Sequence, residues 1–281
     1  MSFLDKVTTE QKKRGIRIMI YGEPKTGKSY FGTQIPNHVF LNLENGLEHL
    51  KGATKLPYTS EYVEVKAMLS ELATTDHPYK TLVVDSADVL ENLIRKWIVA
   101  STGNSGYKDI TDIPYGRGYP LLLAETRKLI EMFEYLSAEK GMNIVFICHS
   151  EVKKMQPPIG NEYTYIAPSL YAKTTQGDST LKIYTDYVDI IGYCEYRTIV
   201  KETSTGFGTR GQAIGTGERI MHLDASNPAF IAGSRYPMPK QIPFEWSAFV
   251  QALTGKQPTA AKATELPKES VENETETNNN N

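Results

Sequence analysis

The sequence predicts an α/β fold in which helices cover a mostly parallel central sheet, followed by a β-rich C-terminal portion. Apolar runs typical of strands alternate with amphipathic stretches typical of helices between residues 16 and 149. One of these runs, at residues 81–86, is a near-continuous apolar run, which indicates a strand buried on both faces of a parallel sheet. After residue 149 the alternation ends, and glycine-separated runs predict further strands.

The first strand, residues 18–21, leads directly into the pattern Gly-x-x-x-x-Gly-Lys-Ser. This spacing is typical of a loop that binds nucleotide phosphates, although a glycine turn with an incidental lysine is the alternative. The glycines let successive N–H groups point at phosphate oxygens, Lys28 places an ammonium against the β- and γ-phosphates, and Ser29 can ligate Mg²⁺. Residues 30–35 are expected to form a helix, whose dipole also favours phosphate. The predicted ATP-binding residues are Gly22, Glu23, Pro24, Lys25, Thr26, Gly27, Lys28, Ser29 and Tyr30.

Two later strands end in acids. Residues 38–44 end at Glu44, and the buried strand 81–86 carries Asp85 near its end, with an amphipathic helix expected between them at 62–74. Because the carboxyl ends of parallel strands meet at one edge of a sheet, Asp85 is expected beside the phosphate loop, where it can hold the water shell of Mg²⁺. Glu44 is placed where a general base could act, with a solvated acid as the alternative.

The remaining elements follow the same alternation. The sequence predicts a helix after residue 86, a glycine-rich loop at 101–120, a long helix at 119–140 and a strand at 143–150 that ends at His149 and Ser150. An irregular stretch at 151–180 follows, then strand runs at 187–196, 197–201 and 219–223 and a short helix at 244–253. Turns are expected at Gly206, Gly208, Gly211 and Gly215.

Composition divides the chain into a polar segment at 1–15, one ATPase domain at 16–255 and a tail at 256–281 that is low in apolar residues and ends in four asparagines. Five acids and two bases give residues 257–281 a charge of −3, so the preceding body carries +1 of the total of −2. That balance excludes a globally basic DNA-binding protein but leaves room for a local basic surface. The tail is either a solubilising or a partner-binding segment.

Composition also bears on the compartment. No apolar run approaches the ~18–20 residues of a membrane span, and the first residues lack the apolar core of a signal peptide. Cys148 and Cys194 both lie in predicted strands, which favours buried thiols over a disulfide or a metal site. We therefore expect a cytoplasmic protein without a membrane partner.

Taken in order, these motifs resemble the RecA-type P-loop core, and within it the small phage RecA-like ATPases linked to single-strand annealing and recombination, over residues 15–255. Residues 40–44 resemble the RecA strand whose terminal glutamate activates the attacking water, and 83–86 resemble the Mg²⁺-associated strand. Residues 146–149 resemble the strand whose terminal amide senses the γ-phosphate, although His149 stands where RecA has glutamine. The resemblance implies that Glu44 is the catalytic base and that His149 is the sensor.

Residues 233–236 are similar to the Lys-Asn-Arg-Phe motif of RadA-type relatives, in which basic residues reach the nucleotide of a neighbouring subunit. The first lysine is missing here, so the resemblance implies Arg235 as the catalytic residue in trans and self-association with nucleotide at subunit interfaces. The appended C-terminal domain of RecA is absent from this sequence, which leaves filament formation open.

The resemblance also suggests where DNA would bind. Residues 150–175 occupy the place of the second DNA loop of RecA, and Lys153, Lys154, Tyr163 and Tyr165 have the lysine and aromatic chemistry that single strands need. A solvated connection or a subunit contact is the alternative, and Arg117 in the 101–120 loop is a weaker candidate.

The phosphate-loop motif predicts a Mg²⁺-dependent ATPase, and the resemblance implies that it acts on single-stranded DNA in recombination, annealing or replication, in the host cytoplasm if it is phage-encoded. A single-strand-binding protein or another replication or recombination protein is the partner that the resemblance suggests. One alternative is another motor on the same core, such as a hexameric helicase or a packaging ATPase. An AAA+ remodeller is disfavoured, because the β-rich segment after His149 leaves no room for a helical lid. A third reading is an ATP-binding assembly module with negligible turnover.

Overall fold

The computed structural model describes residues 4, 7–8, 13–157, 159–173, 177–205 and 208–256, with side chains outside 199–214. Within these residues, a nine-stranded sheet has the order β2-β3-β4-β1-β6-β7-β9, with β5 paired to β4 and β8 paired to β6. The strands are β1 (Arg17–Gly22), β2 (His38–Asn42), β3 (Thr81–Asp85), β4 (Asn143–Met155), β5 (Tyr163–Pro168), β6 (Ile190–Thr205), β7 (Gly208–His222), β8 (Gly233–Ser234) and β9 (Gln241–Pro243).

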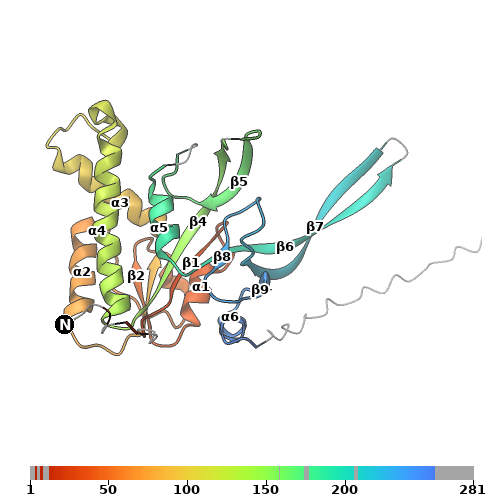
Figure 1. The fold of residues 1–281 in the computed structure, drawn as a ribbon, viewed down its shortest axis with the longest axis horizontal. Coiled ribbons are helices and arrows are strands. Elements are labelled where there is room, and N and C mark those ends of the chain that lie inside the picture. Colours follow the sequence, from red (N-terminus) through yellow and green to blue (C-terminus); the bar gives the residue numbers. More distant parts are fainter. Residues whose placement is uncertain are drawn as a thin grey trace, which may run out of the picture.

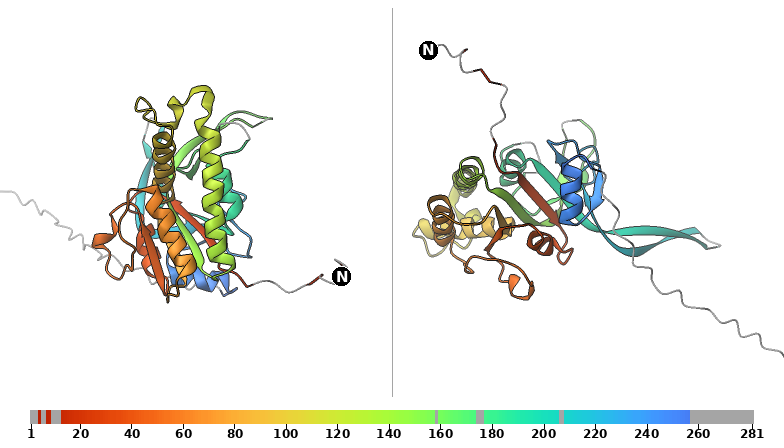
Figure 2. Two further views of the ribbon diagram at one scale, coloured as in Figure 1. Left: turned by 90° about the vertical axis from the view of Figure 1, so that its left-hand side faces the viewer. Right: turned by 90° about the horizontal axis from the view of Figure 1, so that it is seen from below.

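The helices cover the sheet on both faces (Figures 1 and 2). They are α1 (Lys28–Thr33), α2 (Tyr62–Thr74), α3 (Ala87–Ser101), α4 (Gly118–Ala138), α5 (Thr180–Tyr187) and α6 (Trp246–Leu253), with short 3₁₀ turns at Leu47–His49, Ile110–Asp112 and Pro114–Gly116. Pairing is parallel between β1 and both β4 and β6, between β2 and β3, and between β3 and β4. The predicted α/β class with a largely parallel sheet is confirmed.

Alternating side chains of β1 divide the core into two clusters. Met19 and Tyr21 point to the face covered by α2, α3, α4 and α5, whereas Ile18 and Ile20 point to the face covered by α1 and α6. All four side chains are at most 1% exposed. Burial on both faces explains why the central strands are continuous apolar runs.

The outer edge of the sheet is covered at β2. The N–H of Phe40 donates to the carbonyl of Thr54 at 2.8 Å, and the N–H of Leu56 donates to the carbonyl of Phe40 at 2.9 Å. Residues 53–56 therefore run parallel to β2 and satisfy backbone groups that an edge strand would otherwise expose.

The structure corrects several expectations after residue 149. β4 does not end at Ser150 but continues to Met155 and pairs antiparallel with β5, so most of the predicted loop at 150–175 is a hairpin. Tyr187 ends helix α5 and does not begin a strand. β6 and β7 form one long antiparallel ribbon that projects from the sheet (Figure 1).

The predicted turns in this ribbon are wrong at Gly208, Gly211 and Gly215, which are all paired within β7. The turn expected at Gly206 lies outside the described residues, as does the tail at 257–281. In the loop at 101–120, two 3₁₀ turns precede α4. Among the described residues, every helix is too short or too polar to cross a lipid bilayer.

Candidate active site

The phosphate loop begins where β1 lies between β4 and β6. Gly22 is level with His149 on one side and with Cys194 on the other. A β-carbon at Gly22 would lie 2.1 Å from the carbonyl oxygen of Cys194, so only glycine fits there. Gly27 has a φ of +92°, a left-handed conformation that glycine adopts without strain. Both motif glycines are thus required by the backbone.

Lys28 lies inside the loop that precedes it. The side chain is buried, and its ammonium donates to the carbonyl oxygens of Gly22 and Glu23, both at 2.8 Å. Burial lowers the pKa of Lys28, although the negative charge of Asp85 opposes that change. The ammonium is therefore held at the loop by neutral acceptors, which an anionic phosphate can outcompete.

Asp85 ends β3 and accepts a hydrogen bond from the hydroxyl of Ser29. Burial raises the pKa of Asp85 to about 6, the Ser29 hydrogen bond and the charge of Lys28 oppose this rise, and the charge of Glu44 adds to it. A buried carboxylate beside a hydroxyl is an oxygen-only ligand set, as Mg²⁺ prefers, and the raised pKa indicates that its charge is incompletely compensated. Ser29 and Asp85 therefore fit a Mg²⁺ ion that accompanies bound nucleotide.

Glu44 follows β2 by two residues and lies at the same edge of the sheet. Its carboxylate accepts a hydrogen bond from the hydroxyl of Ser86 and lies 3.8 Å from Nδ1 of His149. The structure thus brings Glu44, Asp85 and His149 to one edge beside Lys28, as the sequence predicts.

Asp88 is a site residue that the sequence analysis missed. It lies in the first turn of α3, and its carboxylate accepts from the backbone N–H of His149 at 3.1 Å and contacts Nδ1 of the same residue at 2.9 Å. This hydrogen bond raises the pKa of His149 against the effect of its burial. Burial alone would raise the pKa of Asp88, but the bonds and charge of His149 lower it. The available signal was an acid three residues after Asp85, at the start of the following helix.

Glu44, Asp88 and His149 together form a compact polar group beside the phosphate loop. One ligand atom from each lies within 4.8 Å of the others, so the group could also hold a cation. A second polar contact connects the loop to the hairpin, because the hydroxyl of Ser150 donates to the carboxylate of Glu23 at 2.9 Å.

Arg235 lies away from the phosphate loop of its own chain. It follows β8, and its guanidinium bonds to Asp189 at 3.0 Å and to the carbonyl of Asp186 at 2.6 Å. These partners precede β6, at the opposite end of the parallel strands from Gly22. A role for Arg235 in a neighbouring subunit stays a prediction.

The predicted DNA-contacting residues lie together on the β4–β5 hairpin, but they differ in exposure. Tyr163 is 44% exposed, whereas Tyr165 is only 8% exposed and packs with the core. Tyr165 therefore offers little of its ring to a base in this structure, and its contact with DNA stays a prediction. Lys153 and Lys154 form ion pairs with glutamates of the same hairpin, at 2.8 and 3.2 Å.

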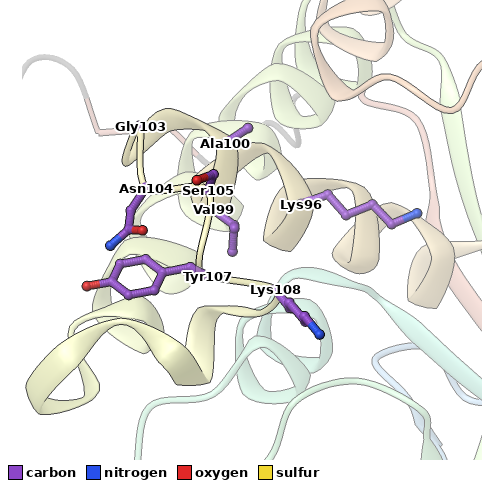
Figure 3. A pocket seen from close by; sticks show the side chains of 8 residues that line it. All are labelled: Lys96, Val99, Ala100, Gly103, Asn104, Ser105, Tyr107 and Lys108. Atoms are coloured by element: carbon purple, nitrogen blue, oxygen red, sulfur yellow. The ribbon is translucent and has the colours of Figure 1, made fainter.

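Arg117 lies outside the β4–β5 hairpin, immediately before α4, and its guanidinium is 5.6 Å from the ring centroid of Tyr115. A separate cavity of about 420 Å³ lies between the end of α3 and the following loop, and Arg117 does not line it (Figure 3). Lys96, Tyr107 and Lys108 line it, and it includes none of the residues of the phosphate loop.

Comparison with known families agrees with this geometry. A family model described as an AAA domain matches residues 14–236. The chain belongs to this family. The matched AAA domain includes the phosphate loop, the acids after β2 and β3, His149, the hairpin and the ribbon, and it makes the protein a P-loop ATPase by family. No curated protein matches the chain significantly.

Proposed function

We propose that this AAA-domain protein is a Mg²⁺-dependent ATPase of the phage RecA-like type that acts on single-stranded DNA during recombination, annealing or replication. The observation that supports it most is the convergence of Lys28, Asp85, Glu44 and His149 at the carboxyl edge of the parallel strands. Catalysis of phosphoryl transfer consists mainly of positioning and charge stabilisation, and these groups supply both.

Each side chain has a distinct part in this proposal. Lys28 and the loop amides bind the phosphates, and Ser29 with Asp85 would hold Mg²⁺, which neutralises charge on the phosphate oxygens when bound. Glu44 orients the attacking water. Asp88 fixes the imidazole of His149 through Nδ1 and leaves Nε2 to donate to the γ-phosphate.

The site is continuous with the proposed DNA surface. His149 is part of β4, and the next residue, Ser150, contacts Glu23 of the phosphate loop. The same strand then carries Lys153 and Lys154, opposite the β5 strand with Tyr163. A change at the γ-phosphate can therefore reach the hairpin through a single strand. Lysines that neutralise phosphates and an exposed ring for base stacking support single-stranded DNA as the ligand.

The first test is steady-state phosphate release by the wild type and by Lys28→Ala, with and without single-stranded DNA, at low and high salt. We expect DNA to stimulate the wild type, salt to weaken the stimulation, and Lys28→Ala to lose ~10²–10³-fold in kcat. Hydrolysis that is indifferent to DNA would contradict the DNA proposal. ATP binding with negligible phosphate release would instead support an assembly module. Translocation that depends on duplex DNA would support a helicase-type motor.

The hairpin is tested separately with Lys153→Ala/Lys154→Ala and with Tyr163→Ala. Both variants should weaken binding of a labelled oligonucleotide, and the lysine variant should also reduce its salt dependence. Lys182→Ala is a matched control, because Lys182 is exposed on α5 and pairs with Asp186 away from the hairpin. Equal weakening by the control would contradict a specific hairpin surface.

A further inference from the structure

Strand alternation places one arginine of the ribbon over the phosphate loop. Cys194 of β6 pairs with Met221 of β7, and both are buried on the face covered by α1 and α6. Two residues further along, the next pair on this face is Tyr196 with Arg219. Because Cys194 is level with Gly22, this pair lies just beyond the edge of the sheet, beside the phosphate loop.

Both members of the pair contact the loop. The hydroxyl of Tyr196 donates to the carbonyl of Lys25 at 3.3 Å. The guanidinium of Arg219 lies so close to Gly27 that a β-carbon there would be 2.2 Å from Nη1. Its central carbon is 5.6 Å from the ring centroid of Tyr30, which is 48% exposed. The guanidinium therefore lies across the second half of the phosphate loop.

Arg219 differs from Arg197, its neighbour on the ribbon, because no carboxylate among the described residues pairs with it. Arg197 pairs with Glu218 at 3.0 Å, whereas Arg219 has no acidic partner among the residues described. A guanidinium beside a phosphate-binding loop and without a carboxylate has the donors and the charge to bind phosphate oxygens. A β-carbon at Gly27 would displace only this flexible end of Arg219, so the requirement for glycine there rests on the left-handed φ of +92°.

The Tyr196–Arg219 pair is also the last regular pair before the ribbon leaves the sheet. The register shifts immediately after it, so that Thr198 pairs with Gly215. The extra residues on β7 form a bulge, in which the hydroxyl of Thr216 donates to the carbonyl of Arg197 at 3.0 Å. Beyond the bulge the two strands project away from the body, as the right-hand view of Figure 2 shows.

We propose that Arg219 binds the phosphates of the nucleotide held by its own chain, and that this contact couples nucleotide occupancy to the ribbon. The inference rests on the proposed nucleotide-binding function of the loop. When its guanidinium binds phosphate, Arg219 changes its contacts with Gly27 and Tyr30. Because Arg219 lies at the base of the ribbon, this movement also changes the strand pairing next to the bulge.

The test measures equilibrium binding of ATP and of ADP to the wild type and to Arg219→Gln, Arg219→Lys, Arg197→Gln and Lys28→Ala. We expect Arg219→Gln to bind ATP ~10–100-fold more weakly, in line with loss of a charge-assisted hydrogen bond, and Arg219→Lys to be intermediate. Arg197→Gln, which removes the neighbouring paired arginine, should match the wild type. Circular dichroism and the Tm establish whether each variant is folded. If Arg219→Gln does not fold, the affinity of Arg219→Lys for ATP still tests the proposal.

A second readout is amide hydrogen exchange at residues 195–198 and 215–219, with and without saturating nucleotide. Exchange should slow on binding in the wild type and stay unchanged in Arg219→Gln at saturation. Wild-type affinity in both Arg219 variants, with loss in Lys28→Ala, would overturn this inference and leave the proposed function standing. Failure of the wild type to bind ATP would overturn the proposed function itself.

Discussion

The two ends of the parallel strands carry buried aspartates with opposite surroundings. At the amino end, the carboxylate of Asp189 is 1% exposed and bonds to the guanidinium groups of Arg14, Arg17 and Arg235 at 2.8–3.1 Å. Burial would raise its pKa, but the hydrogen bonds and charge of Arg17 hold that pKa below its usual value. At the carboxyl end, burial raises the pKa of Asp85 to about 6.

The carboxylate of Asp189 therefore holds parts of the fold together, whereas the carboxylate of Asp85 is available to bind a ligand. Asp189 bonds to the guanidinium groups of three arginines, and through them it connects the N-terminal segment, β1 and the residue after β8. Asp85 has a hydroxyl and the ammonium of Lys28, which itself bonds to two carbonyls. An aspartate that is paired internally contributes stability, and one that lacks compensation costs stability until a cation arrives.

The largest expected effect is at the paired end. Asp189→Asn should lower the free energy of unfolding by about 3–5 kcal/mol, because three guanidinium groups lose the buried carboxylate that they share and the buried Arg17 keeps only the partly exposed Glu134. Urea denaturation measures this. Asp178→Asn is the matched control, since its pair with Arg127 is exposed and its loss should cost under about 1 kcal/mol. Equal effects of the two substitutions would contradict the comparison.

The same substitution at the other end should have the opposite sign. Since the folded pKa of Asp85 lies above its ordinary value, ionisation destabilises the fold as pH rises from about 4 through 6. Asp85→Asn should therefore raise the free energy of unfolding by ~1–3 kcal/mol at pH 8, with the gain vanishing below pH ~4. The variant should also lose Mg²⁺-dependent ATP hydrolysis. A loss of stability at pH 8 would refute this assignment of Asp85.

A smaller effect is expected within the site. The hydrogen bond of Asp88 is the main cause of the raised pKa of His149, so Asp88→Asn should lower that pKa, because the opposing effect of burial then counts for more. NMR titration of the imidazole signals measures this. Glu44→Gln, which removes only a more distant charge, should lower the same pKa less. The reverse order would show that Glu44, and not Asp88, sets the charge of His149.

The smallest effect tests redundancy at the paired end. Arg14→Ala should lower the free energy of unfolding by only about 0.5–1 kcal/mol, because Asp189 keeps Arg17 and Arg235. Chemical denaturation of this variant alongside Asp189→Asn distinguishes the two. A loss as large as that of Asp189→Asn would mean that the N-terminal segment, and not Arg17, neutralises the buried carboxylate.

The parts of the site that the sequence predicts are those with local signals. The phosphate loop is one contiguous motif, and the apolar runs of β3 and β4 mark the strand ends that bring Asp85 and His149 together. Asp88 had no such signal, because its role depends on a contact with His149 across 61 residues of chain. Arg219 is part of no motif, and only the pairing register of β6 and β7 places it over the loop.

The hairpin was missed, and the ribbon was predicted only as separate short strands with turns between them, for a related reason. Beyond His149 no residue of β4 is buried, with Val152 at 68% exposed, and only part of β5, including Tyr165 and Ala167, packs with the core. The buried positions are therefore too few to produce an alternating pattern along both strands. Glycines inside β7 look like turns in the sequence because glycine is depleted in strands, and only the pairing with β6 shows that the segment is extended. Side-chain patterns predict strands only where a core selects the side chains.

The segment that runs beside β2 has a consequence for how copies of this protein can meet. A bare outer strand offers free N–H and carbonyl groups to any other chain that can extend alongside it, which leads to aggregation or open-ended polymers. Here, the backbone of Phe40 is already bonded to Thr54 and Leu56 of its own chain. Lateral growth of the sheet through this part of β2 is therefore blocked. The backbone of Phe40 thus offers no free pairing groups to a second copy of the chain.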